Sequence, residues 1–177
     1  MAKSLKTLFV DGNRLQGTIP NEWTAWEQLE VFGLWSNRLS GALPSWLVNV
    51  TTLTWIGLQD NGLLNGTIPT DLWQLTNLTG FGNYNNQFTG PIPTVGMANM
   101  TAMESLSLAG NVLTSTIPSE LALMTNLKML NLQRNEFVGQ VPTELATLEN
   151  LRTSTCFFVC LFVACMRMME QVLWRLS

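Results

Sequence analysis

Apolar and polar residues recur along this chain in a repeat of nearly constant length. The repeat is clearest between Leu127 and Pro142, where three spaced leucines are followed by an asparagine, a glycine and a Val-Pro dipeptide. A dipeptide of Ile, Leu or Val before Pro occurs at 19–20, 43–44, 68–69, 92–93, 117–118 and 141–142, in steps of 24 or 25 residues. Spaced leucines at this period are typical of a solenoid in which each repeat forms one coil.

Within each repeat, alternating apolar positions predict a short strand, because successive side chains of a strand point to opposite faces. The inward positions are Leu8/Val10, Phe32/Leu34, Ile56/Leu58, Phe81/Asn83, Leu106/Leu108 and Leu130/Leu132. They predict parallel strands near 7–10, 31–35, 55–58, 80–83, 105–108 and 129–132. Asn83 places an amide where the other coils have an aliphatic group, so we expect the fourth coil to be the least stable.

An asparagine follows each predicted strand. The column consists of Asn13, Asn37, Asn61, Asn86, Asn111 and Asn135. A side-chain amide both accepts and donates hydrogen bonds, so a buried column can satisfy backbone groups of successive coils. We interpret these residues as structural.

The segment after each proline predicts a short helix on the convex side. The residues directly after proline are Asn21, Ser45, Thr70, Thr94, Ser119 and Thr143, all types that favour an N-cap. The inward helical positions are Trp23, Leu47, Leu72, Leu121 and Leu145, then Trp26, Val50, Leu75, Met124 and Leu148. Residues 1–152 are therefore predicted to form an α/β solenoid, a right-handed superhelix of about six to seven coils with a parallel concave sheet and short convex helices.

Residues 153–177 depart from the repeat. The continuously apolar run from Phe157 to Met166 is about half the length that a membrane-spanning helix needs. We favour a helix that covers the last coil over membrane association through 156–166. The cysteines at 156, 160 and 165 have no histidine near them and do not have the spacing of a zinc site.

Composition excludes several classes of function. Nine basic residues against 12 acidic ones give a net charge of -3 and no basic stripe, so we expect no nucleic-acid partner. The chain has no histidine, and no nucleophile with a base, carboxylate pair or phosphate-binding loop can be placed. We therefore expect no enzymatic activity, no metal and no cofactor.

The pattern LxxLxLxxNxLxGxIPxxL, seen at 127–142 and 29–44, resembles the plant-type leucine-rich repeats of receptor-like kinases, receptor-like proteins and polygalacturonase-inhibiting proteins. Matching coils cover residues 5–151. The resemblance implies an extracellular recognition surface on the concave sheet, with a short second sheet following the main one. Because no signal-peptide core or capping segment precedes the first strand, we expect a fragment that can self-associate through its uncapped N-terminal coil.

The outward strand residues predict a groove on the concave face. Glycines of three neighbouring coils form its floor, and large side chains flank them. The predicted ligand-binding residues are Val31, Gly33, Trp35, Trp55, Gly57, Gln59, Gly82 and Tyr84. Aromatic rings with a polar edge suit sugar faces and extended peptides. The alternative is that Trp35 and Trp55 pack on each other across the glycines.

Four Asn-x-Thr motifs predict glycosylation of a secreted chain, at Asn49, Asn65, Asn77 and Asn99. All four lie outside the predicted concave sheet. They favour an extracellular or cell-surface location.

These features predict a non-catalytic recognition module that binds a protein, peptide or glycan on its concave face. The alternative is a structural or adhesive spacer without a dedicated ligand.

Overall fold

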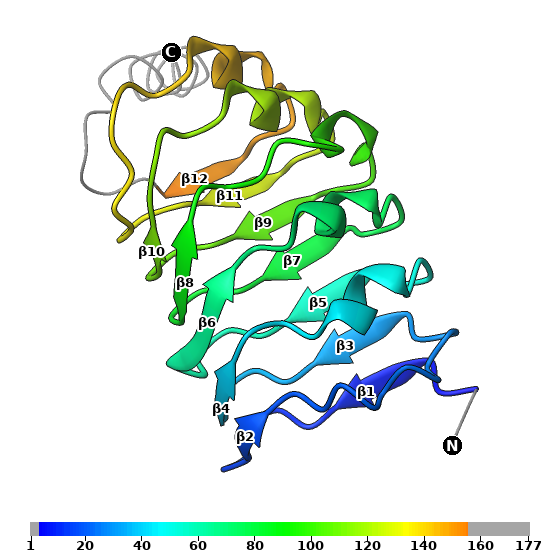
Figure 1. The fold of residues 1–177 in the computed structure, drawn as a ribbon. Coiled ribbons are helices and arrows are strands. Elements are labelled where there is room, and N and C mark those ends of the chain that lie inside the picture. The colour runs from blue at the N-terminus through cyan, green and yellow to red at the C-terminus, as the bar shows by residue number, and fades with distance from the viewer. Residues whose placement is uncertain (1–3, 156–177) are drawn as a thin grey trace, which may run out of the picture.

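The computed structural model describes residues 4–155. The chain winds into a curved stack of coils, with the strands of two sheets on adjoining sides and short helices on the remaining side (Figure 1). Each coil contributes the same elements in the same order, so residues one repeat apart in the sequence lie side by side in space. The predicted solenoid is confirmed.

The main sheet has seven parallel strands in the order β1-β3-β5-β7-β9-β11-β12. They are β1 (Thr7–Phe9), β3 (Val31–Gly33), β5 (Trp55–Gly57), β7 (Gly80–Gly82), β9 (Ser105–Ser107), β11 (Met129–Asn131) and β12 (Thr153–Thr155). The register pairs Leu8 with Phe32, and Phe32 with Ile56, so the inward side chains form one continuous column. The six strands predicted from the alternation are confirmed, and β12 extends the sheet past residue 152.

The second sheet has five parallel strands in the order β10-β8-β6-β4-β2, as the resemblance implied. They are β2 (Gln16–Thr18), β4 (Arg38–Gly41), β6 (Leu63–Thr67), β8 (Gln87–Gly90) and β10 (Val112–Leu113). Gly41 and Gly90 end their strands with φ of 80° and 77°. Ser115 adopts φ 71° at the equivalent place in the next coil, where β10 has only two residues.

The convex side carries short 3₁₀ helices instead of α-helices. They are η1 (Ser45–Asn49), η2 (Thr70–Gln74), η3 (Met97–Asn99), η4 (Ser119–Leu123) and η5 (Thr143–Thr147). The expectation that the residue after proline is the N-cap is wrong. In η1 the N-cap is Pro44, whose carbonyl accepts a hydrogen bond from the Leu47 amide at 3.1 Å, so Ser45 already lies inside the helix.

The first coil has turns in place of the predicted convex helix over residues 21–28. Trp23 and Trp26 fill this side instead, with their ring centroids 4.4 Å apart. Trp46 of the next coil lies 6.4 Å from Trp23 and 6.1 Å from Trp26, and it also contacts Phe32 of the core at 5.7 Å. Two indoles thus give the first coil the bulk that a helix supplies elsewhere.

The core is a single apolar column running through the stack. The inward convex residues from Leu47 onward are buried or half-buried, and Asn83 is fully buried among the aliphatic strand positions. None of the helices within residues 4–155 is both long and apolar enough to cross a membrane. The terminal helix expected over 153–177 falls, from residue 156 on, outside the described residues.

Candidate functional site

The predicted site residues lie together on the concave face. The strand register places Val31 beside Trp55, Gly33 beside Gly57, and Gly57 beside Gly82. Trp35, Gln59 and Tyr84 lie two residues beyond the ends of β3, β5 and β7, so they form a further row on three neighbouring coils. Trp35, Trp55 and Tyr84 are half-buried.

The glycine floor is not an open groove: Trp35 and Trp55 pack on each other across Gly57, which is the alternative to the groove that the sequence left open. A methyl group added at Gly57 would overlap the indole of Trp55 and lie 3.0 Å from Cε3 of Trp35. One added at Gly33 would lie 2.5 Å from Cδ1 of Phe9, and one at Gly80 would lie 2.5 Å from Cδ1 of Trp55. The rings lie across the glycines because no side chain there holds them away.

The result is an aromatic ridge made of Phe9, Trp35 and Trp55. Phe9 and Trp35 meet edge to face with centroids 5.4 Å apart, and Trp35 and Trp55 do so at 5.3 Å. Edge-to-face contact is a favoured geometry for ring pairs, and it fixes each ring against its neighbour. Phe9 was not among the predicted ligand-binding residues, although the register places it beside Gly33; it is 54% exposed and forms one end of the ridge.

A polar group adjoins the ridge at the ends of β5 and β7. The Asn85 side chain donates to Oδ1 of Asp60 at 2.7 Å. Burial raises the pKa of the Tyr84 phenol above its usual value, and the charge of Asp60 together with a hydrogen bond to Asp60 adds to this. Oε1 of Gln59 lies over Gly82, buried and without a hydrogen-bond partner. Gln59 is therefore the least firmly held polar side chain of this group.

Charged residues precede the strands at the other rim of the concave face. Lys6 pairs with Glu30, and Lys128 pairs with Glu104, both at 2.7 Å. Thr54 and Thr79 occupy the same row in the coils between, and their hydroxyls donate to backbone carbonyls of the preceding coils at 3.0 and 2.9 Å. Lys6, Glu30, Glu104 and Lys128 are thus paired, the centre of the rim is neutral, and Arg152 before β12 adds an exposed charge at its C-terminal end.

The asparagine column lies behind the concave face. Oδ1 of Asn61 accepts from the Leu39 amide at 3.0 Å, and its Nδ2 donates to the carbonyls of Leu58 at 2.8 Å and Leu34 at 3.2 Å. Asn37, Asn86, Asn111 and Asn135 likewise connect neighbouring coils. Asn13, in the first coil, is exposed and bonds only within its own turn.

Two further sets of polar contacts were not foreseen from the sequence. The indole Nε1 of Trp46 donates to the Pro20 carbonyl at 2.9 Å, and that of Trp73 donates to the Pro93 carbonyl at 2.6 Å. Neither tryptophan occupies a column of the repeat. Another asparagine series donates to carbonyls of the preceding coil, at Asn77, Asn126 and Asn150.

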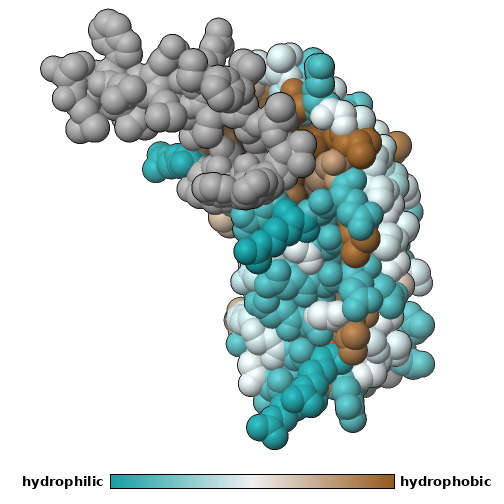
Figure 2. All heavy atoms as spheres, turned by 90° about the vertical axis from the view of Figure 1, so that its left-hand side faces the viewer, coloured by the Kyte–Doolittle hydropathy of each residue, from teal (hydrophilic) through white to brown (hydrophobic). Residues whose placement is uncertain are grey.

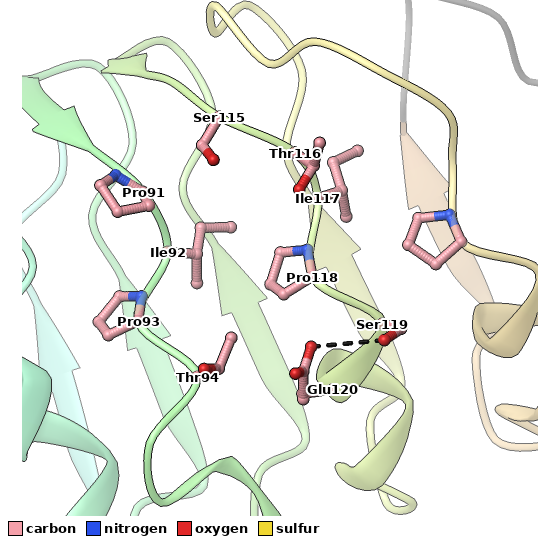
Figure 3. Close-up of a pocket in the computed structure, with 11 residues that line it drawn as sticks. Pro91, Ile92, Pro93, Thr94, Ser115, Thr116, Ile117, Pro118, Ser119 and Glu120 are labelled. Atoms are coloured by element: carbon pink, nitrogen blue, oxygen red, sulfur yellow. Dashed lines mark hydrogen bonds between the residues drawn. The ribbon is translucent and has the colours of Figure 1, made fainter.

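A shallow hollow of about 560 Å³ lies away from the ridge, between two successive proline segments (Figure 3). Residues 91–94 line one side and residues 115–120 the other, and Ile92 points between them. Pro91, Pro93 and Pro118 lack amide hydrogens, and the pairing of β8 with β10 ends at Gly90 and Leu113, just before the two segments that line the hollow. The hollow follows from the interrupted pairing.

The other surfaces have a different character from the ridge. Figure 2 shows the flank at which the main-sheet strands end, where hydrophilic residues cover most of the surface and apolar ones form a narrow column.

The four Asn-x-Thr asparagines are all exposed. Asn49 and Asn99 end η1 and η3, Asn65 lies in β6, and Asn77 precedes β7. Within residues 4–155, no three His, Cys, Asp or Glu side chains form a group that could hold a metal ion.

Comparison with known proteins gives consistent matches to repeat ectodomains. The family model described as Leucine Rich Repeat matches residues 4–26 and 126–148. The ectodomain of the Arabidopsis thaliana membrane receptor kinase GASSHO1/SCHENGEN3, solved in complex with CASPARIAN STRIP INTEGRITY FACTOR 2, is 35% identical over 85% of this chain, with a TM-score of 0.81. The plant peptide hormone receptor RGFR1 in complex with RGF2 is 34% identical over 83%, with a TM-score of 0.79.

The chain spans 18% and 23% of the length of these two receptor structures. A shorter relative, from the BIR3–SERK2 complex of Arabidopsis thaliana, is 30% identical with a TM-score of 0.66. That match covers 76% of this chain and 70% of the relative. No curated protein sequence matches the chain.

Proposed function

The chain belongs to the leucine-rich repeat family of plant receptor ectodomains, and from this membership we propose that its concave main sheet is a non-catalytic recognition surface for a peptide segment. Relatives of similar fold are peptide receptors: RGFR1 was solved with RGF2, and HAESA with the peptide hormone IDA and the co-receptor SERK1. The proposal concerns only the surface that this chain carries.

The observation that carries the proposal is the aromatic ridge. Phe9, Trp35 and Trp55 place three large rings on the outer face of the sheet, where folding alone would be served by short polar residues. Rings that are partly exposed and held by their neighbours are typical anchors of binding sites, because little side-chain entropy is lost when they are covered. A structural or adhesive spacer needs no such surface.

The test is a peptide array and a glycan array, probed with the 177-residue chain and with the double variant Trp35→Ala, Trp55→Ala. We expect peptide binding that weakens at least about tenfold in the double variant, since aromatic anchors carry a large share of binding energy. The matched control is Glu104→Gln with Lys128→Gln, which removes an exposed ion pair of the rim. Equal binding by wild type and the tryptophan variant, with unchanged folding, would move the site to the convex or lateral surface, and binding by neither protein would favour the spacer. Binding on the glycan array alone would assign the ridge to sugars.

We further propose that this surface lies outside the cell or on its surface. The support is the receptor ectodomains among the relatives and the four exposed Asn-x-Thr motifs. Expression through a secretory pathway, followed by glycosidase treatment, tests the proposal by the shift in mass. Single replacements by glutamine at Asn49, Asn65, Asn77 and Asn99 assign any glycan to its site. A secreted chain without any glycan would remove this support.

A further inference from the structure

On the premise that the concave sheet binds a peptide, we propose that the recognised segment is uncharged and carries a proline or aromatic ring. The ring would rest on the ridge beside Trp55, and the extended backbone of the ligand would continue over the next two coils. The inference rests on three features of the concave face: its lack of charge, its step in height and its few free polar groups.

The first feature is neutrality. The first and third residues of β1, β3, β5, β7, β9 and β11 point outward, and none of these twelve positions holds Asp, Glu, Lys or Arg. In the row two residues beyond, only the first coil has a charge, at Asp11. A charged ligand side chain laid on this surface would lose hydration without meeting a counter-charge, which is unfavourable. The centre of the face therefore selects against charge.

The charges nearest to the centre are already engaged. Asp60 accepts from Asn85 at 2.7 Å. Lys6 and Glu30 neutralise each other at one end of the rim, as do Glu104 and Lys128 at the other. A ligand charge at the centre would have to separate one of these pairs, or reach as far as the exposed Arg152 before β12, to find a partner.

The second feature is a step from the ridge down to a shelf of small residues. Trp55 overlies Gly80, and the register sets Gly80 beside Ser105 and Gly82 beside Ser107. Gly82 and Ser105 are half-buried and carry little or no side chain, so an extended chain can lie close to the sheet backbone there, while Gly80 and Ser107 are buried. The indole of Trp55 stands at the border between the ridge and the shelf and forms the side wall of the step. A ring packed into this corner contacts the indole on one side and the shelf below, which is how aromatic-lined surfaces take proline-containing segments.

The third feature separates a peptide from a sugar. A sugar ring carries several hydroxyl groups, each of which needs a partner when it is buried. The ridge rings offer at most the indole N–H groups, and the hydroxyls of Thr54 and Thr79 are used in backbone contacts. Of the shelf serines, Ser107 is buried and Ser105 is half-buried, and the Gln59 amide lies over Gly82 with its buried Oε1 without a partner. A single amide suits one backbone N–H of a peptide once Gln59 turns outward.

The experiment is an array of synthetic decapeptides in four sets: uncharged with proline or aromatic residues, uncharged without rings, acidic with rings, and basic with rings. The probe is the 177-residue chain. We expect the first set to bind best, and its affinity to change less than about twofold between ~50 and ~500 mM NaCl, because no exposed charge pair is involved.

Two variants connect the result to the ridge. Trp55→Ala should weaken binding of the first set at least about tenfold. Gly57→Ala keeps all the indoles but displaces Trp55, and it should act in the same direction even where Trp55→Ala folds poorly. The variant pair Glu104→Gln with Lys128→Gln serves as the control that leaves binding unchanged.

The outcomes separate this inference from the proposed function. If acidic or basic sets bind best, with strong salt dependence and loss in the Trp55→Ala variant, the concave site stands and the inference of a neutral ligand is wrong. Equal binding by ring-free uncharged peptides would remove the ring requirement. If no set binds, or if binding ignores both ridge variants, the inference and the proposed function fail together.

Discussion

Trp35 and Trp55 meet edge to face at 89°, with centroids 5.3 Å apart, above the backbone of Gly57. The contact exists because a glycine stands between them: any β-carbon at residue 57 would overlap Trp55 and press on Trp35. At Gly82, on the neighbouring strand, the nearest atoms to an added β-carbon belong to the Gln59 amide and the Ile56 carbonyl, not to a ring. The two glycines are thus a natural pair for a comparison.

Gly57→Ala should displace both indoles and destabilise the fold by about 1–2 kcal/mol. The steric cost of the added methyl group exceeds the stabilisation that comes from a less flexible unfolded chain. Near-ultraviolet circular dichroism should change clearly. Gly82→Ala is the control: its methyl group would lie 2.9 Å from Oε1 of Gln59, the end of a flexible side chain that can turn outward. That variant should keep the aromatic spectrum and be neutral or up to about 1 kcal/mol more stable. Equal spectral changes in both variants would show that the rings are not held by Gly57.

The position of the strands could be predicted because burial requires it. Leu8, Phe32 and Ile56 stack in register, and a shift by one residue would turn each of them to solvent. The sequence named the packing of Trp35 on Trp55 across the glycines as one of two alternatives, but the repeat pattern could not decide between them. Whether an indole stands beside a glycine or lies across it depends on side-chain rotamers and on rings of adjacent coils, and the repeat pattern carries neither.

On the convex side, too, the sequence predicted which residues are buried but not the detailed conformation. The inward residue Leu47 was identified from its spacing, but the helix type was not. Only five residues fit between Pro44 and Val50, and hydrogen bonds from each residue to the third one before it close the turn in that length. Trp46 and Trp73 hydrogen-bond to prolines of a preceding and a following coil respectively, so no single spacing rule would have found both.

Asn61→Ala should destabilise the protein by about 2–3 kcal/mol, because it leaves the buried Leu39 amide without an acceptor and opens a small cavity. Asn13→Ala should cost less than about 1 kcal/mol, because water can replace the bonds of this exposed side chain. Urea denaturation of both variants measures the difference. Similar losses would mean that the column stabilises each turn locally and does not connect coils.

The first coil should mediate self-association at high concentration. β1 and β2 are edge strands of their sheets, and Phe9 and Leu15 are 54% and 44% exposed. Light scattering over a concentration series should show a rising mass. Leu15→Lys should reduce that rise, because a lysine at an edge opposes pairing. A constant monomer mass for wild type at every concentration would contradict the prediction.

Asn83→Leu should stabilise the fourth coil by about 1–2 kcal/mol. Nδ2 of Asn83 is buried and without a partner, while the equivalent positions hold leucine at 34, 58, 108 and 132. Its Oδ1 accepts from Asn86 at 2.9 Å, but Asn86 also donates to the Leu58 carbonyl at 3.0 Å and so keeps a partner. Replacing the amide removes a desolvation cost and adds apolar burial. Thermal unfolding should show a higher melting temperature for Asn83→Leu than for the wild type. Leu108→Asn, which places a buried amide at the same position one coil later, should lower the melting temperature.

Tyr84 is the single tyrosine of the chain, so its titration can be followed without a signal from another phenol. Burial, and then the charge and hydrogen bond of Asp60, raise the pKa of the Tyr84 phenol above 10.0 in the folded state. The folded protein therefore keeps this proton at a pH where the unfolded chain has lost it. The resulting stabilisation is fully present below pH 10.0, the unfolded value, and is lost as the pH rises through the folded pKa. Ultraviolet difference spectra of the phenolate should place the titration midpoint of Tyr84 in the folded protein above pH 10.0.

Asp60→Asn should lower this midpoint only in part, because burial is the larger cause of the raised pKa. In Tyr84→Phe, unfolding measured across the same alkaline range should lose the component that this phenol contributes. A transition at or below 10.0 in the wild type would mean that Tyr84 is open to solvent and does not contact Asp60.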